Sequence, residues 1–184
     1  EKAWAYKDHG KSWSAVHERQ HPPGFRWLHE SFGNNWRMTE MQAAIGRIQL
    51  RRMVEWHERR KANAEQLASV FSTLPGLRVP LPLVDVEHAW YKFYTFVQPE
   101  ALEPGWSRDR IMAEVNAAGV PCYSGSCSEV YLEKAFDGTE WRPAQRLAVA
   151  KALGETSLMF LVHPTLSDEE IKKTGKVVAG VMGR

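Results

Sequence analysis

The chain has 184 residues, of which 43% are hydrophobic and 25% are charged, and its formal net charge is +2. This length and apolar share predict one globular domain, or one domain with part of another, and so small a charge excludes nucleic acid and membrane surfaces from the expected partners. No segment approaches the roughly 18 consecutive apolar residues of a membrane-spanning helix. Cys122 and Cys127 form neither a disulfide framework nor a usual metal-ligand spacing, so we expect free thiols in a cytoplasmic protein.

Residues 1–32 are expected to be irregular, because aromatic side chains are scattered among charges and Pro22-Pro23-Gly24 interrupts any helix. The segment also holds several histidines, but their spacing fits no compact metal site and few carboxylates lie near them, so no metal is expected. We expect this segment to pack against a domain outside the chain or to form a dimer surface. The histidines are His9, His17, His21 and His29.

The stretch from Gly33 to Leu50 is predicted to be a polar loop followed by a helix. Glycine and asparagine tolerate left-handed backbone geometry, and Thr39 can cap the helix. The amide of Asn35 and the guanidinium of Arg37 could bind an anion such as a phosphate or could satisfy nearby backbone groups, and spacing alone favours the second interpretation. An apolar stripe with helical period follows, made of Met41, Ala44, Ile45 and Ile48.

The helix is predicted to continue to about Thr73, where Leu74-Pro75-Gly76 ends it. Its polar side carries basic residues interleaved with glutamates, and Glu55 and Arg59 have the spacing of a favourable i,i+4 ion pair. We therefore expect a solvated, salt-bridged face rather than a nucleic-acid surface. The basic residues are Arg51, Arg52, Arg59, Arg60 and Lys61.

After Gly76 the sequence pattern changes to short alternating units, which predict a compact α+β sandwich. Aromatic and β-branched residues indicate the strands. Ser107 and Gly119 bound one helix, Pro143 lies in the first turn of another, and a capping box at Ser167 starts the last. The predicted strands are 90–97, 120–123 and 157–162, and the predicted helical segments are 108–118, a turn at 131–136, 143–153 closed by Gly154, and the helix after Ser167.

The motif Gly-Asn-Asn-Trp-Arg-Met at 33–38, followed by Gln-Ala-Ala-Ile-Gly-Arg-Ile-Gln-Leu at 42–50, resembles the DegT/DnrJ/EryC1/StrS family of sugar aminotransferases. Weaker similarity extends to Asp8-His9-Gly10, His88-Ala89-Trp90-Tyr91 and Val162-His163-Pro164. The resemblance implies the α/β fold of type I transferases that use pyridoxal 5'-phosphate (PLP). The chain is similar to the C-terminal half of such a protein.

The resemblance also implies a domain division and an activity. A linking helical region with the end of the large cofactor domain is expected at 1–74, and the small C-terminal α+β domain at 75–184. The full-length protein would aminate a keto group of a nucleotide-linked sugar, with glutamate as the amino donor.

Family members hold PLP on a lysine that precedes a Gly-Glu-Gly-Gly pattern. This chain contains neither, so we expect no catalytic residue in it and no activity from it alone. Two alternatives stay open. One is a dehydratase relative, in which the lysine is replaced, and the other is a non-catalytic dimerisation or scaffold module.

The resemblance assigns roles to particular residues. Asn35 would reach the cofactor phosphate of the other subunit of a homodimer, and Arg37 would meet the same phosphate or a substrate anion. Tyr91, Tyr123 and His163 are candidate substrate contacts, although His163 could equally be a capped histidine before a proline. The chain departs from the family after the middle strand, because many members have a histidine in a Pro-Leu-His pattern where this chain has Gly-Ser-Cys-Ser at 125–128. That departure leaves the sugar undefined.

Overall fold

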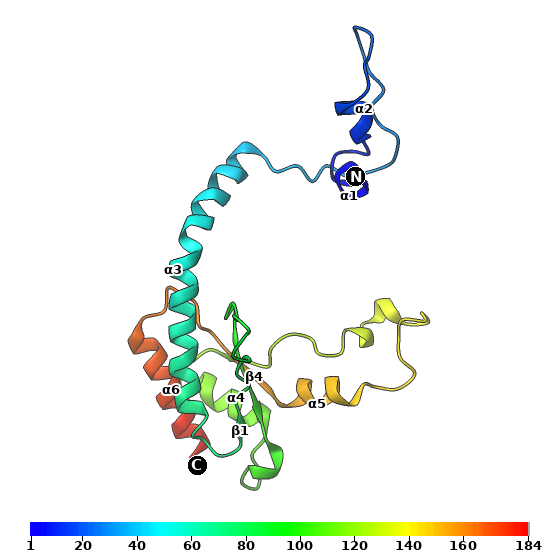
Figure 1. The fold of residues 1–184 in the computed structure, drawn as a ribbon. Coiled ribbons are helices and arrows are strands. Elements are labelled where there is room, and N and C mark those ends of the chain that lie inside the picture. The colour runs from blue at the N-terminus through cyan, green and yellow to red at the C-terminus, as the bar shows by residue number, and fades with distance from the viewer. Residues whose placement is uncertain (184) are drawn as a thin grey trace. The chain divides into compact units, whose positions relative to one another are not determined.

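The computed structural model describes residues 1–183 (Figure 1). The chain forms two compact units, Glu1–Arg52 and Met53–Arg184, and the boundary between them falls inside helix α3 (Glu40–Phe71). None of the helices within residues 1–183 combines the length and the apolar content that a membrane span needs. The division of the full-length protein into 1–74 and 75–184 stays a prediction.

The first unit contains two short helices, so the expectation that residues 1–32 are irregular is wrong in part. The helices are α1 (Lys2–Lys7) and α2 (Trp13–His17), and the Ser12 hydroxyl caps α2 by accepting a hydrogen bond from the Ala15 amide at 3.3 Å. A capping side chain can start a helix even in a polar sequence, because it satisfies an otherwise free N–H group. The rings of Trp4 and Trp13 meet edge to face at 5.1 Å and join the two helices.

Two glycines allow the chain to fold back on itself in this unit. Gly10 has a φ of +90°, and a Cβ placed there would lie 1.7 Å from the carbonyl oxygen of Ser31. A Cβ on Gly33 would lie 2.6 Å from both the Gly10 nitrogen and the Tyr6 oxygen. Because only glycine fits such close backbone contacts, the two residues bring segment 6–11 against segment 29–36.

Helix α3 begins where the sequence predicts, since the Thr39 hydroxyl accepts from the Gln42 amide at 3.3 Å and the Gln42 side chain accepts from the Thr39 amide at 2.9 Å. The predicted apolar stripe lies on the helix but is largely exposed in this chain, with Met41 78% and Ile45 59% exposed. The final part of the helix is instead buried, and it contributes Ala64, Leu67, Ala68 and Phe71 to the core.

The predicted pair between Glu55 and Arg59 is not among the ion pairs of residues 1–183. Arg59 instead lies 2.8 Å from the carboxylate of Asp168 and donates to the Leu166 carbonyl, also at 2.8 Å. The basic side of α3 is therefore not a simple solvated face, because long-range partners compete with the local i,i+4 pair.

The second unit is built on an antiparallel sheet of four strands in the order β1-β2-β4-β3. The strands are short, and the expected strands at 90–97, 120–123 and 157–162 are each found with narrower bounds. Phe93 pairs with Phe160, which in turn pairs with Cys122, so three strands meet in one row. The bounds are β1 Leu77–Arg78, β2 Phe93–Val97, β3 Cys122–Tyr123 and β4 Ser157–Phe160.

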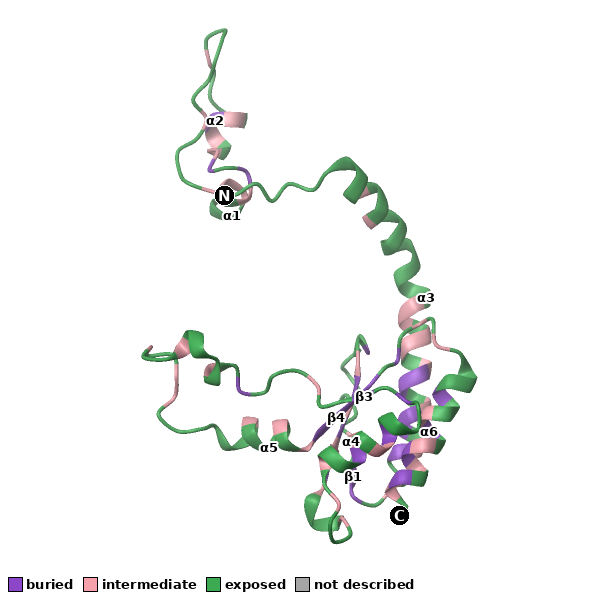
Figure 2. Cartoon of the chain, turned by 180° about the vertical axis from the view of Figure 1, so that it is seen from behind, coloured by how far each residue is buried: buried purple, intermediate pink, exposed green. Residues whose placement is uncertain are grey.

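One face of this sheet packs against helices to form the core, and the buried residues gather there (Figure 2). The ring of Phe71 on α3 contacts Phe160 at 5.0 Å and Phe93 at 5.8 Å. Burying one such large apolar side chain contributes about 1.5–3 kcal/mol, so this aromatic cluster is a main source of stability. Helices α4 (Arg108–Ala117) and α6 (Asp168–Met182) supply Ile111, Val115, Ile171, Val178 and Val181.

The helix starts predicted for α4 and α6 are confirmed. Ser107 accepts from the Arg110 amide at 3.2 Å, and Ser167 with Glu170 forms the predicted capping box. Gly119, just after α4, has a φ of +74°, as a glycine that ends a helix should.

The helix predicted at 143–153 is misplaced, because α5 runs from Ala148 to Thr156 without a side-chain cap. Pro143 therefore lies in the loop before it, and Gly154 lies inside the helix instead of ending it. The predicted turn at 131–136 is present as two 3₁₀ turns. The 3₁₀ helices are η1 Pro99–Ala101, η2 Val130–Leu132 and η3 Lys134–Phe136.

Candidate functional site

The loop before α3 holds Asn35 and Arg37 together in the first unit. Asp8 and Asn35 form an antiparallel backbone bridge, which brings both residues beside segment 8–9. The Nε atom of Arg37 donates to Asn35 Oδ1 at 3.1 Å and lies 3.4 Å from Asp8 Oδ1. Its Nη2 atom donates to the Nε2 atom of His9 at 2.8 Å. Three side chains therefore converge on one guanidinium.

The proton positions in this cluster follow from the chemistry of arginine. A guanidinium only donates, so His9 Nε2 must accept and a neutral ring carries its proton on Nδ1. For the same reason the oxygen of the Asn35 amide faces Arg37, which turns Asn35 Nδ2 away. Among residues 1–183, Asn35 Nδ2 and Arg37 Nη1 donate to no acceptor. Two uncommitted donors, one of them charged, suit an anion.

Asp8, like His9, is a member of the cluster that the sequence did not single out as a cofactor-binding residue. It is 8% exposed, and its Oδ1 atom receives no hydrogen bond among the described residues although Lys11 lies 3.7 Å away. Its charge attracts the Arg37 guanidinium and so helps to fix its direction. Only the backbone bridge to Asn35, which pairs residues distant in sequence, could have indicated this role.

The three predicted substrate residues lie on separate segments of the second unit. Tyr91 precedes β2 and is 73% exposed, and Tyr123 on β3 is 48% exposed. His163 follows β4, and its Nδ1 atom lies 2.8 Å from the Thr165 hydroxyl and 3.4 Å from the Thr165 amide nitrogen. Within residues 1–183 no hydrogen bond or ring contact joins two of these three side chains. Because His163 Nδ1 accepts, Nε2 is the nitrogen that can donate outward.

Tyr94 is a residue of this region that the sequence analysis missed. It pairs with Met159, which pairs with Tyr123, so the two tyrosines share the face of the sheet opposite the core. The Tyr94 hydroxyl accepts from the Ser126 amide at 3.2 Å and lies 3.3 Å from the Ser126 hydroxyl. The alternation of side chains along the strand could have predicted that Tyr94 lies on this face, but it could not have predicted the contact between Tyr94 and the loop.

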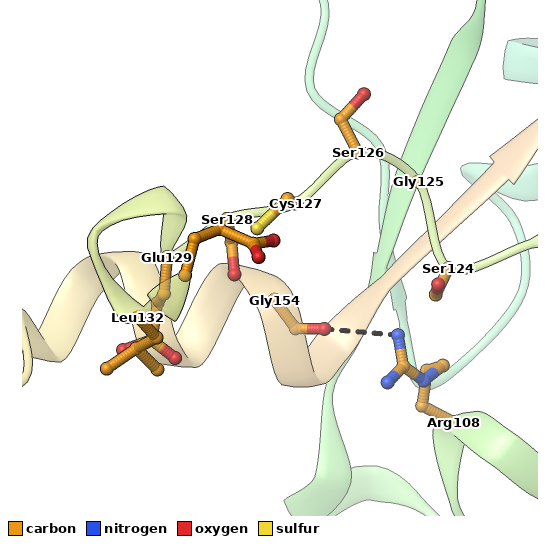
Figure 3. Close-up of a pocket in the computed structure, with 10 residues that line it drawn as sticks. Arg108, Ser124, Gly125, Ser126, Cys127, Ser128, Glu129, Leu132 and Gly154 are labelled. Atoms are coloured by element: carbon orange, nitrogen blue, oxygen red, sulfur yellow. Dashed lines mark hydrogen bonds between the residues drawn. The ribbon is translucent and has the colours of Figure 1, made fainter. Parts of the chain in front are cut away.

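A hollow of about 420 Å³ lies beside that loop and is lined mainly by polar groups (Figure 3). Arg108 borders it and donates through Nη1 to the carbonyls of Gly154 and Ser157, both at 3.1 Å. Its Nε atom donates to Asp109 at 2.7 Å. Loop residues Ser124, Gly125, Ser126, Cys127 and Ser128 form the other side. The hollow therefore offers hydroxyls, a thiol and one guanidinium.

Glu129 closes one end of the hollow and is held by two partners. Arg146 donates to it through Nε at 2.9 Å and through Nη2, and the Tyr131 hydroxyl donates to it at 2.6 Å. The hydrogen bonds from Arg146, followed by that from Tyr131, lower the pKa of Glu129 from 4.5 to about 2. The Leu147 amide donates to the Tyr131 hydroxyl at 2.9 Å, so segment 129–147 forms a closed loop.

Neither cysteine lies in a metal site or a disulfide within the part of the chain that the structure describes. Cys122 is buried and Cys127 is exposed, and neither is in a disulfide. Burial raises the pKa of the Cys122 thiol to about 12, so this thiol is a core residue and not a nucleophile. Across residues 1–183 no group of three histidines, cysteines or carboxylates could hold a metal ion.

Comparison with known proteins identifies the chain's family. The profile of the DegT/DnrJ/EryC1/StrS aminotransferase family matches residues 1–180. The chain belongs to this family. An aminotransferase of known structure from Psychrobacter cryohalolentis is 58% identical to it, with a TM-score of 0.90 over 99% of this chain and 48% of that one. The predicted resemblance is thus confirmed, and the fold is that of DegT-family aminotransferases.

Two curated relatives have different activities in their names. The dTDP-3-amino-3,4,6-trideoxy-alpha-D-glucose transaminase of Streptomyces venezuelae is 29% identical over 77% of this chain and 35% of its own length. The dTDP-4-dehydro-2,6-dideoxy-D-glucose 3-dehydratase of Saccharopolyspora spinosa is 22% identical over 82% of this chain and 32% of its own. The chain spans about a third of these curated relatives and about half of the Psychrobacter structure.

Aminotransferases of the DegT family use PLP, a cofactor that carries a phosphate. The uncommitted donors Asn35 Nδ2 and Arg37 Nη1 have the chemistry that binds a phosphate dianion. Two of the three lysines of the first unit have partners there: Lys11 lies 3.7 Å from Asp8, and the Lys7 ammonium lies over the Trp4 ring at 5.7 Å. This DegT-family chain therefore contains two donors whose chemistry suits a phosphate, and no lysine with the family's sequence context.

Proposed function

We propose that the full-length protein is a PLP-dependent aminotransferase that aminates a keto group of a nucleotide-linked sugar, with glutamate as the amino donor. This chain is its C-terminal part. The observation that carries the proposal is the family match over residues 1–180, supported by 58% identity to the Psychrobacter aminotransferase. The substrate class rests on the dTDP-sugar transaminase, which is 29% identical over 141 residues.

The chain's own residues have defined tasks in this proposal. Bound PLP supplies the electron sink that lets nitrogen pass from the amino acid to the sugar. Asn35 Nδ2 and Arg37 Nη1 donate to its phosphate in the active site of the partner subunit of a homodimer. Asp8 and His9 hold the guanidinium in place, at 3.4 Å and 2.8 Å. A preoriented donor set loses little conformational freedom when the anion binds.

Substrate binding falls to the second unit. The exposed rings of Tyr91 and Tyr123 offer hydroxyls and apolar faces to a sugar nucleotide, and His163 donates through Nε2. The turn at Thr165 fixes the tautomer of His163, since its Nδ1 is engaged at 2.8 Å.

Nitrogen transfer tests this function. The full-length protein, loaded with PLP, is mixed with glutamate labelled at its nitrogen and with a panel of dTDP- and UDP-linked keto sugars. We expect the label in an amino sugar nucleotide, with 2-oxoglutarate formed in equal amount. Controls omit glutamate or replace the keto sugar by the corresponding alcohol. Absence of transfer from glutamate, and from other amino acids tried in its place, would overturn the proposal.

The same assay separates the alternatives. A sugar dehydratase is the second candidate because of the 22% identity to the Saccharopolyspora spinosa enzyme. It would release water from the sugar and leave no labelled nitrogen in the product. A non-catalytic dimerisation or scaffold module would neither retain PLP nor change either substrate.

A further inference from the structure

The polar side of α3 between His57 and Asn63 holds two loops that are distant from it in sequence. His57 Nε2 lies 2.9 Å from the His88 carbonyl oxygen, and its Nδ1 atom lies 3.3 Å from the Glu87 carboxylate. These contacts, with those of Arg60, fasten the loop at 87–91. Arg59 and Asn63 fasten the loop at 162–168. Each loop carries one of the predicted substrate residues.

Arg60 binds the first loop where its backbone is strained. Trp90 has a φ of +47°, a conformation that a bulky residue rarely adopts, and its ring is buried with 8% exposed. Arg60 Nη1 donates to the carbonyl oxygens of Trp90 and Tyr91, at 3.4 Å and 3.3 Å. The guanidinium carbon also lies 5.8 Å from the centre of the Tyr91 ring. One side chain thus stabilises the unusual backbone and contacts the exposed tyrosine.

Asn63 binds the second loop from inside the core. It is fully buried, and its Nδ2 atom donates to the His163 carbonyl at 3.2 Å and to the Val162 carbonyl at 3.5 Å. Arg59 holds the far end of the same loop through the Leu166 carbonyl. Its Oδ1 atom has no hydrogen-bond partner among the described residues, so the two contacts of Nδ2 are what hold the backbone at His163.

The register of the sheet places the two loops at the same end. Phe93, the first residue of β2, pairs with Phe160, the last residue of β4. Tyr91 therefore leaves the sheet where His163 leaves it, on neighbouring antiparallel strands. Arg60 and Asn63 reach the carbonyls of the buried residues Trp90 and Val162 and also those of the exposed residues Tyr91 and His163, and core packing alone does not require the second pair. The polar groups of α3 instead meet the backbone at the two candidate substrate residues.

We propose that Arg60 and Asn63 are positioning residues, which hold Tyr91 and His163 at one end of the sheet so that both meet the same sugar nucleotide. This rests on the proposed function of the full-length protein. A small displacement of a positioned group can reduce a rate by about 100-fold, so loosening the first loop should mainly lower kcat/KM for the keto sugar. The kcat/KM for glutamate should fall much less.

The test uses the full-length protein with Arg60→Ala, Arg60→Lys and Asn63→Ala, and with Glu58→Ala as the control. Glu58 lies on the same helix but is exposed and makes no ion pair within residues 1–183. Amide hydrogen exchange is measured over 87–92 and 161–167, with strand 93–97 as the internal reference. Kinetics with PLP, glutamate and the keto sugar found in the nitrogen-transfer assay are measured on the same samples.

We expect Arg60→Ala to speed exchange over 87–92 alone and to lower kcat/KM for the keto sugar by about 100-fold, more than for glutamate. Arg60→Lys should restore part of the lost kcat/KM, because lysine keeps the positive charge but lacks the planar, forked set of N–H donors of arginine. Unchanged exchange, or faster exchange with unchanged kinetics, would overturn the inference. If Asn63→Ala fails to fold, Arg60→Ala still decides. If the wild-type protein has no transaminase activity, the proposed function fails. The hydrogen-exchange data do not depend on that activity, so they show separately whether Arg60 holds the loop at 87–92.

Discussion

Arg37 organises its surroundings at the scale of a single residue. Its Nε and Nη2 atoms are used by Asn35, Asp8 and His9, which leaves Nη1 and the Asn35 amide nitrogen for an anion. Sequence spacing could not choose between an anion site and a simple cap, because both need the same residue types. The capping of α3 is carried out by Thr39 and Gln42. That leaves Asn35 and Arg37 available for another role.

Replacing these donors should therefore weaken cofactor retention. In the full-length protein, Asn35→Ala removes one hydrogen bond of about 1–3 kcal/mol to the phosphate, which corresponds to roughly 5- to 150-fold weaker PLP binding. Arg37→Ala should weaken PLP binding at least as much, and Arg37→Lys should recover only part of the lost PLP affinity. Equilibrium PLP binding and thermal stability are measured on the same samples. A lower melting temperature with unchanged PLP affinity would contradict the assignment.

Glu129 makes the loop at 129–147 sensitive to acid. Its pKa is lowered from 4.5 to about 2 by Arg146 and Tyr131, so the ionised carboxylate stabilises the fold fully above about pH 4.5. That contribution is lost as the pH falls from about 4.5 through about 2. Glu129→Gln should loosen this loop already at neutral pH and should remove this part of the acid dependence.

Hydrogen exchange of 129–147 against pH, in the full-length protein, checks this prediction. Glu133→Gln is a matched control, because Glu133 also borders the hollow but is exposed and makes no ion pair among the described residues. Identical pH profiles for the wild-type protein and Glu129→Gln would show that the carboxylate does not hold the loop.

At the scale of an element, α5 shows why local signals misplace a helix. Pro143 suits a first turn and glycine often ends a helix, so the sequence favoured 143–153. The structure starts the helix at Ala148, because Arg146 and the Leu147 amide are engaged with Glu129 and Tyr131. A Cβ on Gly154 would lie 2.0 Å from the Ser128 hydroxyl oxygen, so this glycine serves a close approach.

Two glycine substitutions separate helix propensity from this close contact. Alanine favours a helix interior by about 0.5–1 kcal/mol relative to glycine. Gly180→Ala in α6, where a Cβ meets nothing within 4 Å, should raise the free energy of unfolding by that amount. Gly154→Ala should lower it, since the new methyl displaces Ser128 and the loop at 124–128. Denaturant unfolding of both variants provides the comparison, and equal stabilisation by both would disprove the contact.

At the scale of the whole molecule, the first unit exposes apolar surface to solvent. Several large side chains of the first unit are exposed, among them Trp27 at 83%, Phe32 at 100% and Met41 at 78%. Apolar exposure on this scale is typical of an interface. In the proposed full-length protein, this surface would be covered by the rest of the chain or by the partner subunit. The chain spans 48% of the Psychrobacter aminotransferase, and Asn35 serves a neighbouring active site in the proposal.

The full-length protein should accordingly be at least a dimer. Ile45→Asp places a charge on the exposed stripe of α3 and should shift the protein toward monomer, with loss of activity, while the core of the second unit stays intact. Lys176→Glu, on the exposed side of α6, is the control. Sedimentation at micromolar concentration measures assembly. A wild-type protein that is monomeric there and fully active would refute the shared site.

Much of the architecture could be predicted from the sequence, because the signals involved are local. The caps at Thr39, Ser107 and Ser167, the buried strand at 157–160 and the motif at 33–50 all act within a few residues. Such short-range hydrogen bonds and periodicity are the same in an isolated segment and in the folded chain. They determined the α+β class, whereas the family and the candidate residues Asn35 and Arg37 came from the resemblance of the motif at 33–50.

The tertiary structure alone decided which polar groups meet. Arg59 prefers Asp168 to Glu55, Arg60 reaches the backbone at Trp90, and the antiparallel bridge brings Asp8 to Asn35. These partners are distant in sequence, so their pairing depends on strand register and on burial, which local propensity does not encode. The candidate residues were therefore readable from the sequence, whereas the groups that orient them depend on how the chain folds.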